Sequence, residues 1–118
     1  MTPYRPGLHI LATFEAPFST LTDADGCRTV FERLVQELEL VKVGEVYHGF
    51  PNGGFTAVLC LTESHVSIHT WPESGLATFD VFLSNFQNDN TAKVRRFYED
   101  SLRLLAATTV LNHQEIIR

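Results

Sequence analysis

The sequence has few cysteines, and this shortage limits the kind of protein it can encode. Its 118 residues contain only Cys27 and Cys60. Two thiols cannot form the disulfide framework of a small secreted domain, and a Cys/His metal site needs more ligands at closer spacing. We therefore expect a reduced, cytoplasmic protein that binds no metal.

Positive charge and long apolar runs are also scarce. Nine Lys and Arg stand against fourteen Asp and Glu, which gives a net charge of -5 at pH 7. Nucleic-acid binding needs clustered cations, and the densest cluster here is only Lys93, Arg95 and Arg96. No apolar run approaches the ~20 residues of a membrane helix, and His9–Phe14 is too short and polar for a signal peptide. We expect neither a nucleic-acid nor a membrane partner.

The remaining composition is that of a globular domain. Hydrophobic residues make up 44% of the chain and charged residues 19%, and this length fits one domain over residues 1–118. A chain this short has a limited core, so burial of more surface by oligomerisation is expected.

Periodic patterns predict six strands and two helices. The strands are expected at residues 8–14, 41–50, 55–62, 65–71, 76–83 and 108–117, and the helices at 19–40 and 91–107. Apolar residues face inward from both helices: Phe31, Leu34, Val35 and Leu38 in the first, and Val94, Phe97, Tyr98, Leu102 and Leu105 in the second.

Short turns fix the predicted connections. Pro51-Asn52-Gly53-Gly54 is the strongest turn signal, Pro72–Gly75 turns the chain again, and residues 85–90 form a polar break. These turns are too short for the crossovers of a parallel sheet. We therefore predict an α+β fold, a two-layer sandwich in which an antiparallel sheet carries both helices on one face. Cys60 is expected to be a small core residue.

The informative stretch is residues 62–73, which read Thr-Glu-Ser-His-Val-Ser-Ile-His-Thr-Trp-Pro-Glu. With Gly75, Ala77, Asp80 and Phe82 downstream, this string resembles the prokaryotic-type S-adenosylmethionine decarboxylase proenzyme family. Gly7-Leu8-His9 and His48-Gly49-Phe50-Pro51 add to the resemblance.

The resemblance implies that the chain cleaves itself between Glu63 and Ser64. The Ser64 hydroxyl would attack the carbonyl carbon of Glu63 to form an ester, and β-elimination and hydrolysis would then leave a pyruvoyl group. That group is an electron sink for decarboxylation of an amine substrate. No metal is implied, and although His65 and His69 share one strand face, no third ligand follows at a zinc-like spacing.

The resemblance also assigns roles to other residues. His69 matches a histidine that assists self-cleavage, and Thr56 stands where the family has a serine that helps the same step. Phe50 and Trp71 match aromatic residues that flank the substrate adenine, and Glu73 matches the carboxylate that binds the ribose.

One position departs from the family pattern. Where the family reads Phe-Thr-Cys-Gly, with the cysteine as proton donor, this chain reads Phe82-Leu83-Ser84-Asn85. A hydroxyl is a far poorer acid than a thiol. His69, Cys60 or a water would then supply the proton.

Three functions follow from these observations. The first is a self-processing, homodimeric S-adenosylmethionine decarboxylase that serves spermidine synthesis, and the second is a pyruvoyl-dependent decarboxylase of arginine or ornithine. The third is an unprocessed homologue that binds a ligand or a partner without catalysis.

Overall fold

Six strands form one antiparallel sheet in the computed structural model, which describes residues 3–86 and 88–118. The strands are β1 (Leu8–Glu15), β2 (Lys42–Gly49), β3 (Phe55–Leu61), β4 (Ser64–Trp71), β5 (Leu76–Phe82) and β6 (Thr109–Ile117). Their order is β2-β3-β4-β5-β1-β6, and each neighbouring pair is antiparallel. The predicted domain includes residues 1–2 and the predicted polar break includes residue 87, which lie outside the described residues.

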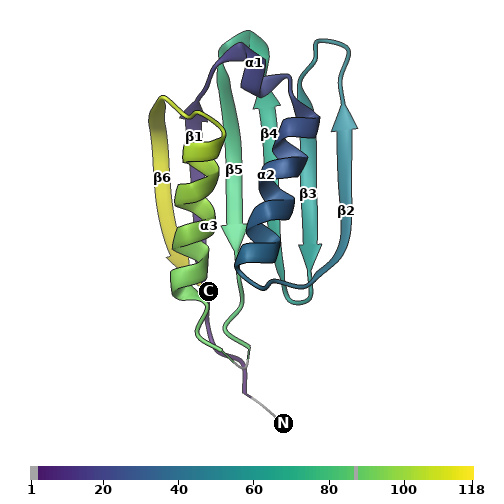
Figure 1. Ribbon diagram of the computed structural model, residues 1–118. Coiled ribbons are helices and arrows are strands. Elements are labelled where there is room, and N and C mark those ends of the chain that lie inside the picture. Colours follow the sequence, from purple (N-terminus) through teal and green to yellow (C-terminus); the bar gives the residue numbers. More distant parts are fainter. Residues whose placement is uncertain (1–2, 87) are drawn as a thin grey trace.

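Two long helices lie side by side on one face of the sheet (Figure 1). They are α2 (Ala24–Glu37) and α3 (Thr91–Leu104). The predicted α+β sandwich is therefore confirmed. Between the layers, the Phe31 ring of α2 stacks on Phe79 of β5 at 5.9 Å and meets Phe97 of α3 at 5.6 Å. This aromatic contact joins both helices to the centre of the sheet.

The predicted bounds of the helices were wrong at their ends. A one-turn helix, α1 (Phe18–Leu21), precedes α2. The chain breaks between them because the Asp23 side chain accepts a hydrogen bond from the backbone N–H of Gly26 and caps α2. The second predicted helix ends earlier than expected, because Ala106 adopts a left-handed φ of 58° that turns the chain into β6.

The other face of the sheet carries no helix in the described part of the chain (Figure 1). We call it the open face. On β4, Val66, Ile68 and Thr70 are buried against the helices, whereas His69 and Trp71 on the open face are exposed. Cys60 also lies on the open face and is exposed, so its prediction as a core residue was wrong.

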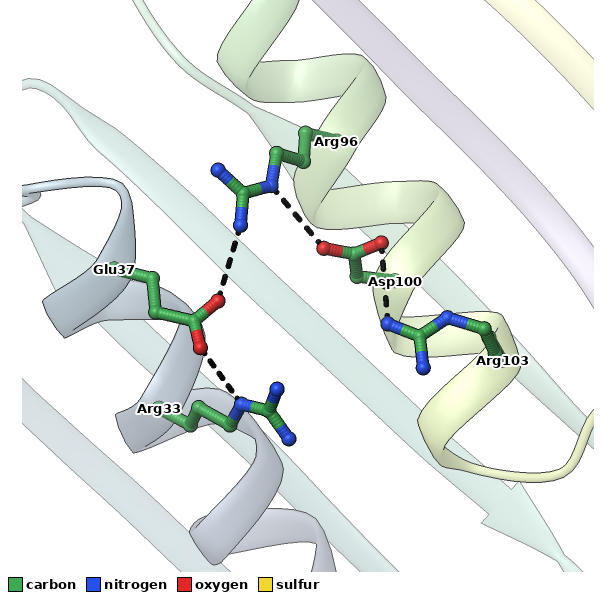
Figure 2. Close-up of polar contacts among 5 residues, drawn as sticks. All are labelled: Arg33, Glu37, Arg96, Asp100 and Arg103. Atoms are coloured by element: carbon green, nitrogen blue, oxygen red, sulfur yellow. Dashed lines mark hydrogen bonds and ion pairs between the residues drawn. The ribbon is translucent and has the colours of Figure 1, made fainter.

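Charged side chains link the two helices along their solvent side (Figure 2). Glu37 of α2 pairs with Arg33 at 2.8 Å and with Arg96 of α3 at 3.1 Å. Such exposed pairs contribute up to about 1 kcal/mol each. The packed core therefore accounts for most of the attachment between the helices and the sheet.

Edge strand β6 is tied to α3 by a charged contact. Nη1 and Nη2 of Arg95 donate to the Glu115 carboxylate, at 2.8 and 2.9 Å. The hydrogen bonds from Arg95 and from His113 lower the pKa of Glu115 to about 2. No helix in the described residues is long and apolar enough to cross a membrane.

Ser101 gives a test of the core. Its side chain on α3 is fully buried, and its hydroxyl has no hydrogen-bond partner among the described residues. An unpaired buried hydroxyl destabilises the folded state. We expect Ser101→Ala to raise the free energy of unfolding by about 1 kcal/mol, measured by urea denaturation. Thr29→Ala, which removes a hydroxyl bonded to the Asp25 carbonyl, is the control. A lower stability of Ser101→Ala would contradict this account of the core.

Candidate active site

The predicted site residues lie in two groups near opposite ends of β4. Ser64 begins the strand, and His69 follows five residues later. At ~3.3 Å per residue the two are roughly 17 Å apart. We call the group around His69 the aromatic half and the group around Ser64 the serine half. Within a single chain, His69 cannot reach the Ser64 hydroxyl.

The aromatic half surrounds a cavity of about 500 Å³. Every predicted residue of this half lines it: Phe50, Thr56, His69, Trp71 and Glu73. Phe50 and Trp71 remain 46% and 47% exposed as whole residues. Large aromatic side chains left half-exposed beside a cavity are typical of a ligand-binding surface.

A tight turn places Phe50 at this cavity. The N–H of Phe50 donates to the carbonyl of Gly54, and the N–H of Gly53 donates back to the carbonyl of Phe50. Gly53 has a φ of 89°, which a residue with a side chain adopts only with strain. Beneath the turn, the buried Thr70 hydroxyl accepts from the N–H of Phe55 and donates to the Leu21 carbonyl. These bonds anchor the turn to the core.

His69 and Thr56 form a hydrogen-bonded pair. They are directly opposed in the β3–β4 register, and 2.8 Å separates Thr56 Oγ1 from His69 Nδ1. The bond occupies Nδ1 and orients the ring. His69 Nε2 is then the nitrogen available to a substrate or a reacting group.

Asn52, which the sequence predicts only as a turn residue, holds Glu73 in place. Asn52 Nδ2 donates to Glu73 Oε2 at 2.8 Å, and Asn52 Oδ1 accepts from the N–H of Gly54. Glu73 itself lies in a short 3-10 helix, Pro72–Ser74. The Pro-Asn-Gly-Gly string was the available signal, since an asparagine in a turn commonly bonds to nearby backbone.

In the serine half, the Ser64 hydroxyl is close to the chain that follows β5. Ser64 Oγ accepts a hydrogen bond from the backbone N–H of Ser84 at 3.0 Å. Ser64 pairs with Leu61, so Thr62 and Glu63 form the two-residue loop of the β3–β4 hairpin. The Glu63–Ser64 peptide bond therefore joins an exposed loop residue to a half-buried strand residue.

Backbone packing fixes the Ser84 amide. A Cβ on Gly7 would lie 2.5 Å from the Leu83 carbonyl oxygen and 3.2 Å from the Ser84 Cα. Only glycine allows this close approach. On the other side, Asn90 Nδ2 donates to the Ser84 carbonyl at 2.8 Å.

Comparisons with known proteins agree with this geometry. The sequence profile of the family described as "S-adenosylmethionine decarboxylase" matches residues 8–114. The chain belongs to this family. It is 37% identical over 94 residues to the S-adenosylmethionine decarboxylase proenzyme of Archaeoglobus fulgidus, a match that covers 79% of this chain and 80% of that one. The family predicted from the sequence is thus confirmed.

A sequence match and a structure match from Aquifex aeolicus extend the comparison. The proenzyme sequence is 44% identical over 77 residues, which cover 64% of this chain and 57% of that protein. The crystal structure titled "adenosylmethionine decarboxylase" matches with a TM-score of 0.85 at 31% identity, over 98% of this chain and 92% of the other. The S-adenosylmethionine decarboxylase family consists of carboxy-lyases that acquire a pyruvoyl group by self-processing.

The serine half of this family member fits a pyruvoyl precursor. Its hydroxyl is held in place by a backbone donor. Cavities of about 370 and 230 Å³ lie beside the Glu63–Ser64 bond, the first lined by Glu63 and Ser84 and the second by Glu63, Ser64 and Ser84. Among the described residues, no three His, Cys, Asp or Glu side chains are grouped so as to hold a metal ion.

His9 is a buried histidine near the serine half, and the sequence assigns it no role beyond its match to the family. His9 is 6% exposed, and its Nε2 has no hydrogen-bond partner among the described residues. Asp80 Oδ1 lies 3.9 Å from that nitrogen, and the His65 ring meets His9 edge-on at 5.6 Å. Burial, partly offset by Asp80, lowers the pKa of His9, which favours a neutral ring at pH 7.

Proposed function

We propose that this chain cleaves itself between Glu63 and Ser64 and decarboxylates S-adenosylmethionine with the pyruvoyl group that results. The observation that carries the proposal is the hydrogen bond from the Ser84 N–H to Ser64 Oγ. A donor at this oxygen stabilises the negative charge that develops when the hydroxyl loses its proton. Ser64 would thereby become a better nucleophile toward the Glu63 carbonyl.

Self-cleavage then proceeds through bonds of this chain alone. Ser64 Oγ bonds to the Glu63 carbonyl carbon and the peptide C–N bond breaks, which leaves an ester and a free amine. Loss of the Cα proton of residue 64 breaks the Cβ–Oγ bond and releases Glu63 as a carboxylate. One water converts the remaining unsaturated amine into the pyruvoyl carbonyl and releases ammonia. That carbonyl supplies the electron sink for decarboxylation.

The aromatic half would bind the nucleoside of the substrate. The half-exposed rings of Phe50 and Trp71 can flank a flat adenine, and the faces of these rings also attract a sulfonium cation. The Glu73 carboxylate can accept hydrogen bonds from ribose hydroxyls. Arginine and ornithine have no adenine to stack between two rings and no ribose to bond to Glu73, so we favour S-adenosylmethionine as the substrate and spermidine synthesis as the pathway.

A homodimer would unite the two halves of the site. The aromatic half lies on the open face, whereas Ser64 begins β4 at the other end of the strand and shares the face of Val66. Two copies packed by their open faces around a two-fold axis would bring the Ser64 end of β4 in one chain near the aromatic half of the other. His69 and Thr56 could then assist cleavage at the Ser64 of the partner.

The first prediction concerns self-cleavage. We expect the intact mass of the denatured protein to show two fragments divided at Glu63–Ser64, the second of which begins with a pyruvoyl group. Borohydride or hydroxylamine should trap that carbonyl, and Ser64→Ala, the control, should remain a single chain of 13.3 kDa. A wild-type chain that stays intact would favour the non-catalytic homologue. Cleavage with release of CO₂ from arginine or ornithine alone would favour the second substrate class.

The second prediction separates the two roles of position 84. The contact with Ser64 comes from the backbone N–H, so Ser84→Ala should cleave itself at the wild-type rate. Ser84→Cys restores a more acidic side chain and should raise kcat for S-adenosylmethionine roughly tenfold or more. Intact mass measures the rate of self-cleavage, and CO₂ release measures kcat. An unchanged kcat would show that the proton comes from another group.

The third prediction tests the shared site by complementation. His69→Ala alone should cleave slowly, and Ser64→Ala should not cleave at all. Co-expression forms heterodimers in which the Ser64 of one variant faces the His69 of the other. Cleavage of the His69→Ala chain should therefore recover in the mixture, as seen by intact mass. Failure to recover, with a mixed dimer confirmed by native mass spectrometry, would rule out a site shared between chains.

A further inference from the structure

The distribution of unpaired cations points to a second binding site. Five of the nine Lys and Arg side chains form ion pairs with carboxylates: Arg33, Lys42, Arg95, Arg96 and Arg103. Arg28 instead lies over the Tyr47 ring at 4.3 Å. Arg5, Lys93 and Arg118 form no ion pair among the described residues.

All three of these cations lie beside the Glu63–Ser64 bond. Arg5 and Arg118 line the cavity of about 370 Å³, and Lys93 lines the one of about 230 Å³. Glu63 lines both cavities and forms no ion pair among the described residues. In a protein with a net charge of -5, unpaired cations at the cleavage site indicate an anion that is absent before cleavage.

The two arginines are held in place without using all their donors. Arg5 Nη2 donates to the carbonyl of Asn85 at 2.8 Å. The Arg118 guanidinium lies over the Phe82 ring at 5.5 Å, with Nη1 3.4 Å from His9 Nδ1. A guanidinium has five N–H donors. Each arginine therefore keeps several donors for a ligand in the cavity.

We propose that Arg5 and Arg118 form a binding site for the Glu63 carboxylate that self-cleavage releases. This inference rests on the proposed self-cleavage. In the elimination step the Cβ–Oγ bond of residue 64 breaks, and its electron pair leaves with the Glu63 carboxylate. Fixed guanidinium groups stabilise such a developing charge. Their fork of donors also matches a carboxylate.

The chemistry of Glu63 fits two cations better than one. After cleavage this residue carries a side-chain carboxylate and a new α-carboxylate. Arg5 and Arg118 can each take one of them. The new chain end would then be held in the cavity and away from the carbonyl formed at residue 64. The two fragments would also stay attached at this end of the sheet.

The test measures cleavage in Arg5→Gln, Arg118→Gln and the double variant after a short pulse of expression. The control is Arg28→Gln, which removes another unpaired arginine away from both cavities. Exposed charge contacts are worth up to about 1 kcal/mol, so each single variant should cleave roughly fivefold more slowly and accumulate the ester. Hydroxylamine cleaves that ester to a Glu63 hydroxamate, which mass spectrometry detects. Arg28→Gln should behave like the wild type, and Arg118→Lys should restore most of the rate.

A second measurement can begin with the wild-type chain alone. Exposed charge interactions are screened by salt, so 1 M NaCl should slow elimination in the wild-type chain and have little effect on the double variant. Carboxypeptidase should also remove Glu63 slowly from the processed wild type and faster from the arginine variants.

Four outcomes would overturn the assignment. If the arginine variants cleave at the wild-type rate without ester, the site is wrong and the proposed function stands. If the wild type never cleaves, both fall. If a Lys93→Gln variant, measured alongside, is the only one that cleaves more slowly, the carboxylate binds in the other cavity. If the arginine variants change only KM for S-adenosylmethionine, the two arginines bind the substrate carboxylate instead.

Discussion

The alternation of side chains along β4 is the constraint on which the site depends. Residues two apart share a face, so Val66, Ile68 and Thr70 build the core while His69 and Trp71 face the open side. A shift of one residue in the β3–β4 register would bury His69 and break its bond to Thr56. Core packing thereby also fixes the functional face of the strand.

Under the proposed function, the length of the same strand separates the two halves of the site within one chain. A strand cannot fold back on itself, so Ser64 at one end and His69 near the other stay roughly 17 Å apart. A reaction that needs both Ser64 and His69 therefore requires a second chain, which supplies one of the two residues. The open face, with Val46 of β2 and Val58 of β3 exposed side by side, offers apolar surface for that contact.

Much of this fold could be predicted from local sequence signals. Alternation located β4, the Pro-Asn-Gly-Gly turn located the β2–β3 hairpin, and the helical stripes identified the inward faces of α2 and α3. The motif that resembles the family spans β4 and one or two residues on each side. Once β4 is located, the motif residues are therefore assigned to the serine half at its start and the aromatic half at its end. The role of each motif residue remains a prediction.

Contacts between distant segments could not be predicted in this way. The break before α2 depends on the Asp23 cap, and the exposure of Cys60 depends on which sheet face the helices cover. The sequence identifies Gly7 only as a residue shared with the family. The structure gives the reason for a glycine, because the Leu83 carbonyl lies too close for a side chain. Arg5 and Arg118 come from opposite ends of the sequence and meet at one cavity.

Under the proposed function, position 84 would contribute to two steps through different atoms. A backbone N–H is the same for serine and cysteine, so the contact with Ser64 Oγ survives the substitution. Proton donation depends on the side chain, so this ability would not survive the substitution. If both steps occur as proposed, self-cleavage would depend on the backbone of residue 84 and decarboxylation on its side chain. Serine at this position would leave formation of the pyruvoyl group intact and would affect only the later protonation of the substrate. The buried His9, whose pKa is lowered by burial, is poorly suited to replace a thiol as the proton donor.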